Sequence, residues 1–230
     1  VKMNNKKRIS TALLSILVGI LFGSIVLLFA GHNPIKVMYN LFYGIFNTPT
    51  SMSYTLVNMA PLLLTGIAAA FAFKTGLFNI GIEGQFIIGS VAATCAGILV
   101  DLPPVIHPIF CMLCAFLAGG LYAAFVGVLK AKFNVNEVIS SIMLNWIALY
   151  FNNYVLTLTA IRQPNSDFSY NISPNASIRI LDSWKSTEAG MEYLAGNSFW
   201  GNFLKAPVNL GLLVGILAVS YTHLRAHETL

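Results

Sequence analysis

The chain has 230 residues, of which 57% are hydrophobic and only 9% are charged. A soluble domain carries about 25% charged residues because its surface must be solvated. This composition therefore excludes a water-soluble globule and makes the lipid bilayer the solvent for most of the chain. The formal net charge of +5 does not indicate nucleic-acid binding, because no basic patch with interleaved aromatic side chains accompanies it.

Apolar runs follow one another along the chain. A helix that crosses a membrane needs about 20 mostly apolar residues. Five runs come close to or exceed this length and a sixth is short: 9–30, 52–73, 84–100, 106–129, 138–160 and the incomplete 206–220. The sequence predicts an all-α fold, a polytopic transmembrane helical bundle with about five full spans and an incomplete sixth.

Basic residues lie in alternate connections between these runs. If the N-terminus is inside, the short inner segments carry seven Lys or Arg, whereas the short outer segments carry only Lys36. Because Lys and Arg are enriched in short cytoplasmic loops, we expect a cytoplasmic N-terminus, with 74–83 and 130–137 inside. Residues 161–205 are then a polar external loop, which is either a docking surface or a solvated connector.

The connection between the second and third runs is rich in glycine and amides. It reads Lys74-Thr-Gly-Leu-Phe-Asn-Ile-Gly-Ile-Glu-Gly-Gln85. Broken helices at membrane depth often line a substrate site in transporters. The alternative is a plain cytoplasmic turn, and both interpretations stay open.

The run 138–160 has one polar face. At about 100° per residue, the residues that share this face are Glu137, Ser141, Asn145, Ala148, Asn152 and Thr159. An unpaired amide or hydroxyl facing lipid costs a few kcal/mol, so this face is expected to point into the bundle. It either lines a route for an uncharged, hydroxyl-rich solute or forms helix–helix hydrogen bonds, which average about 0.6 kcal/mol each.

Small residues recur every fourth position on the run 106–129. They are Ala115, Gly119, Ala123 and Gly127, and Gly19 and Gly23 have the same spacing in the first run. Such ridges let helix backbones approach closely. They predict packing within a bundle and indicate no chemistry.

Several functional classes lack their signatures. The sequence has no GxxxxGK[ST] phosphate loop, and no ionisable residue lies at the middle of a run, where an ion-coupled transporter needs one. Cys111 and Cys114 have no second ligand pair, and His223 and His227 lie in the abruptly polar segment 221–230, which we expect to be a non-native tail. We expect no metal, no cofactor and no catalytic site, and any driving energy is expected to enter through another subunit.

Two segments carry a family resemblance. Gly76-Leu-Phe-Asn-Ile-Gly-Ile-Glu-Gly-Gln-Phe86, followed by Ile88-Gly-Ser-Val-Ala-Ala93, resembles the permease subunits of ABC importers in the ribose/branched-chain amino acid superfamily. Asn136-Glu-Val-Ile-Ser-Ser-Ile-Met-Leu-Asn-Trp-Ile147 is similar to the nucleoside and simple-sugar branch of that superfamily. The resemblance extends over roughly 55–160 and more weakly over 9–220.

The resemblance implies a subunit of an ATP-driven importer in a bacterial cytoplasmic membrane. Its implied partners are cytoplasmic ATPase subunits that hydrolyse the ATP, a second permease subunit, an extracellular lipoprotein that binds the solute, and membrane lipid. Family members are longer, so residues 1–220 are expected to be an incomplete permease domain. Nucleosides are the first expected substrate and ribose-like sugars the second, with a branched-chain amino acid permease or an ion-coupled secondary transporter as alternatives.

The resemblance assigns no individual contacts, so the candidate residues come from the two polar segments. The expected substrate path consists of Asn79, Glu83, Gln85, Ser141, Asn145 and Asn152. Residues with a gating or structural role are expected to be Glu137, Gly76, Gly81 and Gly84.

Overall fold

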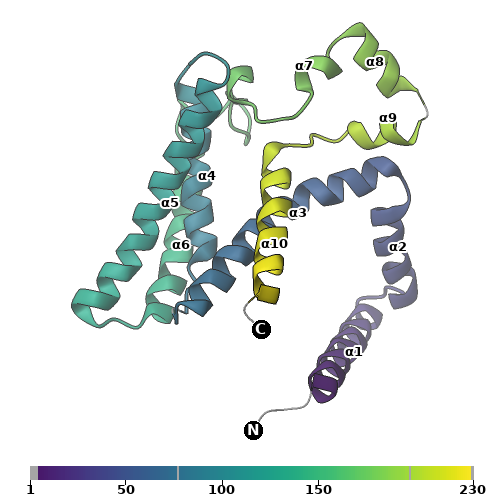
Figure 1. Cartoon of the computed structure of the whole chain (residues 1–230), viewed down its shortest axis with the longest axis vertical. Helices are drawn as coiled ribbons and strands as arrows, with labels where there is room; N and C mark the ends of the chain where they lie inside the picture. Colours follow the sequence, from purple (N-terminus) through teal and green to yellow (C-terminus); the bar gives the residue numbers. More distant parts are fainter. Residues whose placement is uncertain (1–4, 77, 197, 229–230) are drawn as a thin grey trace. The chain divides into compact units, whose positions relative to one another are not determined.

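The computed structural model describes residues 5–76, 78–196 and 198–228, in which the regular elements are helices (Figure 1). In chain order they are α1 (Asn5–Phe29), α2 (Pro34–Phe46), α3 (Pro49–Lys74), α4 (Ile82–Leu99), α5 (Ile106–Phe133), α6 (Glu137–Val155), the 3₁₀ helix η1 (Pro174–Ala176), α7 (Asp182–Lys185), α8 (Glu188–Ala195), α9 (Phe199–Leu204) and α10 (Leu210–Glu228). The expected all-α class is confirmed.

Three of the described helices, α3, α4 and α5, are long and apolar enough to cross a membrane. The segments Leu13–Phe29 and Pro34–Phe46 are bent by 113° and add a fourth span if together they form one broken helix. The polytopic helical bundle is confirmed, whereas the number of spans stays a prediction.

The chain divides into two compact units, which are described separately. The first comprises Val1–Thr55 and Met191–Ala206. It contains α2, which lies between the runs 9–30 and 52–73, where the sequence predicts a short outer connection. The Asn33 side chain accepts hydrogen bonds from the backbone N–H groups of Ile35 and Lys36, and Pro34 occupies the first turn, which together start a helix.

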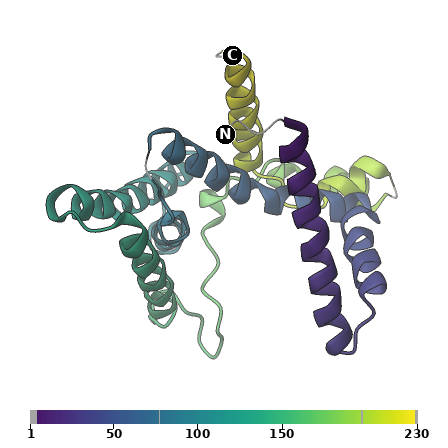
Figure 2. The same ribbon diagram turned by 90° about the horizontal axis from the view of Figure 1, so that it is seen from below.

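The second unit comprises Leu56–Gly190 and Pro207–Leu230, and α4, α5 and α6 lie side by side in it (Figures 1 and 2). A β-carbon on Gly89 would lie 3.2 Å from the Ala115 carbonyl oxygen, and one on Gly119 would lie 3.2 Å from the Gln85 carbonyl oxygen. The close helix approach predicted from the small-residue ridge of α5 is therefore confirmed at Ala115 and Gly119.

Large apolar side chains cover the outside of this helix group. Phe116 is 76% exposed and Leu121 is 71% exposed on α5. Exposed apolar patches of this extent mark a surface that meets lipid or another protein chain. By contrast, a small core cluster of Val91, Val155 and Ile161 is buried.

Two predicted boundaries were wrong. The run 138–160 ends as a helix at Val155, and turns follow in which the N–H of Leu158 bonds to Val155 and that of Ile161 bonds to Leu158. Thr159 is consequently not on the polar face of α6. The last helix begins at Leu210 rather than at 206 and continues through the segment 221–228.

Candidate functional site

The break between α3 and α4 is built by glycine and by one asparagine. Gly76 has φ +78°, a left-handed conformation that glycine adopts without steric cost. Further on, the Asn79 side-chain oxygen accepts a hydrogen bond of 2.9 Å from the N–H of Gly81. This Asx-type turn directs the chain into α4, which begins at Ile82.

Asn145 of α6 binds the same break from the other side. Its Oδ1 accepts a hydrogen bond of 2.9 Å from the N–H of Gly84, and its Nδ2 donates one of 3.1 Å to the carbonyl of Ile80. The first N–H groups of a helix have no partner within the helix, so Asn145 satisfies one of them. This geometry favours helix–helix bonding over solute contact for Asn145.

A glycine is required where α4 meets this asparagine. A β-carbon on Gly84 would lie 2.8 Å from Asn145 Oδ1 and 3.1 Å from Asn145 Cα. Tyr122 of α5, which sequence reasoning did not select, adds a third helix to the junction by donating a hydrogen bond of 2.7 Å to the Leu144 carbonyl. The available signal was that a tyrosine hydroxyl within an apolar helix needs a partner.

A cavity of about 190 Å³, here named the break cavity, lies beside this junction. It is lined by Ala72, Phe78, Asn79, Gln85, Ala123, Val126, Gly127, Lys130, Glu137 and Ser141. The structure thus brings together Asn79, Gln85, Ser141 and Glu137 from the predicted set. The Ser141 hydroxyl is buried and has no hydrogen-bond partner within the described residues.

The two charged residues of the break cavity neutralise each other. Lys130 Nζ lies 2.7 Å from Glu137 Oε1. The hydrogen bond from Lys130 is the main reason that the pKa of Glu137, which precedes the run 138–160, is lowered from its ordinary value. Because only residues 134–136 separate α5 from α6, this ion pair connects the two arms of a tight hairpin. The geometry favours the structural role over the gating role for Glu137.

Asn152 and Glu83 lie outside the break cavity. Asn152 lines a second cavity of about 180 Å³ together with Ser90, Thr94 and Ser169. It is eleven residues beyond Ser141, or about 16 Å along the helix. Glu83 is exposed in the first turn of α4 and lines neither of these cavities. The predicted substrate residues therefore occupy more than one place.

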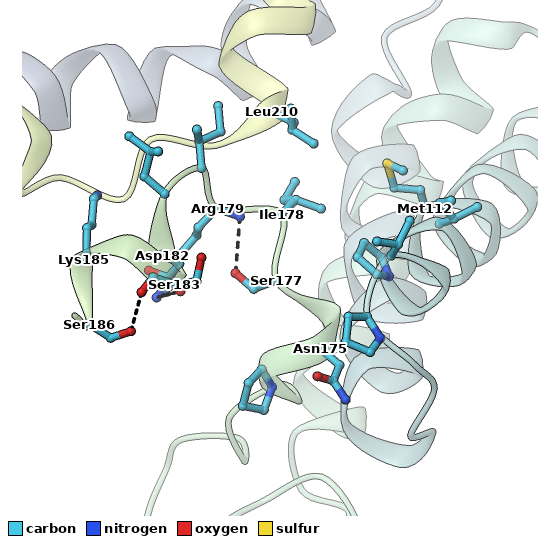
Figure 3. A pocket seen from close by; sticks show the side chains of 17 residues that line it. Met112, Asn175, Ser177, Ile178, Arg179, Asp182, Ser183, Lys185, Ser186 and Leu210 are labelled. Atoms are coloured by element: carbon cyan, nitrogen blue, oxygen red, sulfur yellow. Dashed lines mark hydrogen bonds and ion pairs between the residues drawn. The ribbon is translucent and has the colours of Figure 1, made fainter. Parts of the chain in front are cut away.

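A third cavity is an open groove of about 1070 Å³ (Figure 3). Met112 borders it from α5, whereas Ile178, Arg179 and Asp182 border it from the segment 174–186. Arg179 and Asp182 pair with each other at 3.9 Å. The groove contains none of the predicted residues.

The described residues contain no group of three or more His, Cys, Asp or Glu side chains that could hold a metal ion. The residues that line the break cavity supply amides, one buried hydroxyl, one aromatic ring and an internally neutral ion pair. Such groups bind an uncharged polar molecule by hydrogen bonds and contain no nucleophile–base pair for covalent chemistry.

Comparison with known proteins gives a family match over most of the chain. Residues 51–229 match a family described as the permease component of the branched-chain amino acid transport system. The guanosine ABC transporter permease NupP of Bacillus subtilis is 38% identical over 73% of this chain and 47% of its own length. No solved structure matches the chain.

Two further curated relatives cover nearly the whole chain. The nucleoside ABC transporter permease NupB of Lactococcus lactis is 32% identical over 94% of this chain and 57% of its own length. The glucose ABC transporter permease TsgB13 of Haloferax volcanii is 31% identical over 95% of this chain and 55% of its own length. The chain spans about half the length of the curated relatives that it matches.

Proposed function

The chain belongs to the family of branched-chain amino acid transport system permease components, and from that premise we propose that it is the membrane-spanning permease subunit of an ATP-binding-cassette importer for nucleosides or simple sugars. Relatives named for guanosine, nucleosides and glucose support this cargo class. The apolar helices and the family make the chain a multi-pass membrane protein. We place it in a bacterial cytoplasmic membrane with its N-terminus inside.

The observation that carries the proposal is the neutral lining of the break cavity. Asn79, Gln85 and Ser141 offer uncharged hydrogen-bonding groups. Lys130 and Glu137 cancel each other at 2.7 Å. A zwitterionic amino acid needs opposite charges that are free to pair with it, whereas a nucleoside or sugar needs neutral donors and acceptors. The cavity accordingly favours the neutral cargo.

Within this proposal the residues have different roles. Asn79, Gln85 and Ser141 contact the solute at the break cavity, and Asn152 contacts it at the second cavity further along α6. Glu83 lies near the cytoplasmic end of the route, on the exposed side of α4. The residues that hold the break in shape are Asn145, Glu137, Gly76, Gly81 and Gly84.

The driving force comes from partner proteins in this proposal. The chain contains no phosphate-loop motif, so we assign ATP hydrolysis to separate cytoplasmic ATPase subunits, with a second permease subunit beside this chain and an extracellular lipoprotein that delivers the solute. The break cavity has a volume of about 190 Å³. A typical small-molecule pocket has roughly 300–1,000 Å³. The break cavity therefore holds part of a solute at one time, as expected of a site along a route.

Solute uptake in proteoliposomes tests the proposal. The transporter assembled around this permease chain should accumulate labelled guanosine or glucose only when ATP reaches the ATPase subunits. An ATPase variant that cannot hydrolyse ATP is the control and should abolish accumulation. Accumulation driven by an ion gradient without ATP would instead establish the secondary-transporter alternative.

A further inference from the structure

One aromatic ring, that of Phe78, borders the break cavity. Phe78 lines the cavity and is 51% exposed. Its ring stacks on that of Phe73 at the end of α3, with centroids 5.2 Å apart and planes 20° apart. The stacked partner restricts the Phe78 ring while half of its surface stays open. A flat ring held in this way is suited to stacking against another flat ring.

The side-chain amides of Asn79 and Gln85, which line the same cavity as Phe78, form only weak hydrogen bonds with each other. Asn79 Nδ2 donates to Gln85 Oε1 at 3.3 Å, and Gln85 Nε2 donates to Asn79 Oδ1 at 3.4 Å. Both distances exceed the usual 2.7–3.2 Å of an N–H···O bond. Each NH₂ group keeps one further N–H, and Gln85 Oε1 keeps one lone pair. A ligand can use these groups without breaking a strong bond.

Ser141 adds a polar group that lacks a partner. The residue lines the break cavity, and its hydroxyl is fully buried and makes no hydrogen bond within the described residues. A buried hydroxyl without a partner is costly. A rotation of the Ser141 side chain that turns this hydroxyl toward a ligand in the cavity removes the cost, and the hydroxyl can then act as donor or acceptor.

We infer that the break cavity binds the nucleobase of a nucleoside, with the base stacked on Phe78 and its edge bonded to Asn79, Gln85 or Ser141. Every base has a flat π face, and Asn and Gln side chains pair well with base edges. A simple sugar has hydroxyls but no aromatic face. The inference rests on the proposed function and narrows its cargo to nucleosides.

The size of the cavity agrees with one ring system. Its volume of about 190 Å³ lies below the roughly 300 Å³ at which pockets for complete small molecules begin. The base enters the cavity in this arrangement, and the ribose lies outside it. Phe78 then determines specificity through the face of the base, while the three polar side chains read its edge.

Replacement of Phe78 in the assembled transporter tests the inference. Phe78→Leu keeps an apolar side chain but removes the π face, so the KM for guanosine uptake should rise about tenfold or more. Phe78→Trp should keep a KM close to that of the wild type. Phe71→Leu is the matched control, because Phe71 is 71% exposed on α3 and lines none of the cavities described above; its KM should not change.

A binding measurement covers the case in which Phe78→Leu fails to assemble. In the Phe78→Trp variant, guanosine should quench indole fluorescence beyond the wild-type background, whereas glucose should not. An unchanged guanosine KM in Phe78→Leu, or an absence of additional quenching, overturns the inference and leaves the permease function intact. A wild-type transporter that carries glucose and no nucleoside overturns it too. If the wild type carries neither solute with ATP, the proposed function itself fails.

Discussion

Gly84 is a residue at which α4 closely approaches the backbone of α6. Its N–H donates to Asn145 Oδ1 at 2.9 Å, and a β-carbon there would lie 2.8 Å from the same oxygen and 3.1 Å from Asn145 Cα. The side-chain oxygen can move only by giving up its bond, and the Cα atom belongs to the helix. The position is therefore closed to any side chain.

Gly84→Ala should destabilise the protein by about 1–3 kcal/mol, the usual cost of overpacking a tight contact. Thermal unfolding in detergent measures this as a lower Tm. Gly120→Ala is the matched control, since nothing lies within 4 Å of a β-carbon at Gly120, and alanine favours a helix over glycine by about 1 kcal/mol. Equal Tm values for the two variants would contradict the close contact.

The sequence was sufficient to place the polar residues of α6 but not to identify their partners. Helical periodicity put Ser141, Asn145 and Asn152 on one face, and in the structure this face is buried or half-buried. Periodicity carries no information about a neighbour sixty residues away. The bonds from Asn145 to the break, and the separation of Asn152 into another cavity, required the arrangement of α4 against α6.

The hairpin of α5 and α6 has a charged residue at each of the two helix ends that meet at its turn. Lys130 lies near the C-terminal end of α5 and Glu137 is the first residue of α6. Each charge therefore suits the dipole of its own helix, and the two charges also pair with each other. With three residues between the helices, the pair links the two arms beside the turn.

Glu137→Gln should lower the Tm at neutral pH, and the difference from the wild type should disappear in acid. Because the pKa of Glu137 is lowered from its ordinary 4.5, its contribution is fully present above pH 4.5 and is lost as the pH falls through the folded-state value. Lys132→Met is the control, because Lys132 lies in the same last turn of α5 with no ion partner within the described residues. A Tm difference that persists in acid would exclude the ion pair as its cause.

Element boundaries could be predicted only where local signals were strong. The helix α2 was missed because the search was for runs long enough to span, and α2 has only thirteen residues. Asn33 and Pro34 are nevertheless a local signal for the start of a helix. The end of α6 was placed too late because apolar residues continue to 160. The chain leaves the helix there so that Ile161 packs beside Val91 and Val155, and a contact between distant segments has no local signature.

At the scale of the whole molecule, composition predicted the solvent, and the lengths of the apolar runs predicted the fold class. A chain with 9% charged residues can fold only where lipid covers its apolar surface, and the outward-facing side chains of α5 agree with this. The number of spans is less accessible, because α6 combines a length suited to a span with amides that lower its hydropathy. Its 19 residues extend about 28 Å at 1.5 Å per residue, close to a hydrocarbon core of about 30 Å.

Cysteine labelling on either side of α6 tests both this span and the orientation. In a background without Cys95, Cys111 and Cys114, Val135→Cys lies in the turn before α6 and Asn171→Cys in the exposed segment after it. Lys130 and Lys132 beside the turn favour its retention inside. A membrane-impermeant maleimide added to intact cells should therefore label Asn171→Cys and not Val135→Cys, whereas both should react after permeabilisation. Labelling of both positions in intact cells would mean that α6 does not cross the membrane, and labelling of Val135→Cys alone would reverse the orientation.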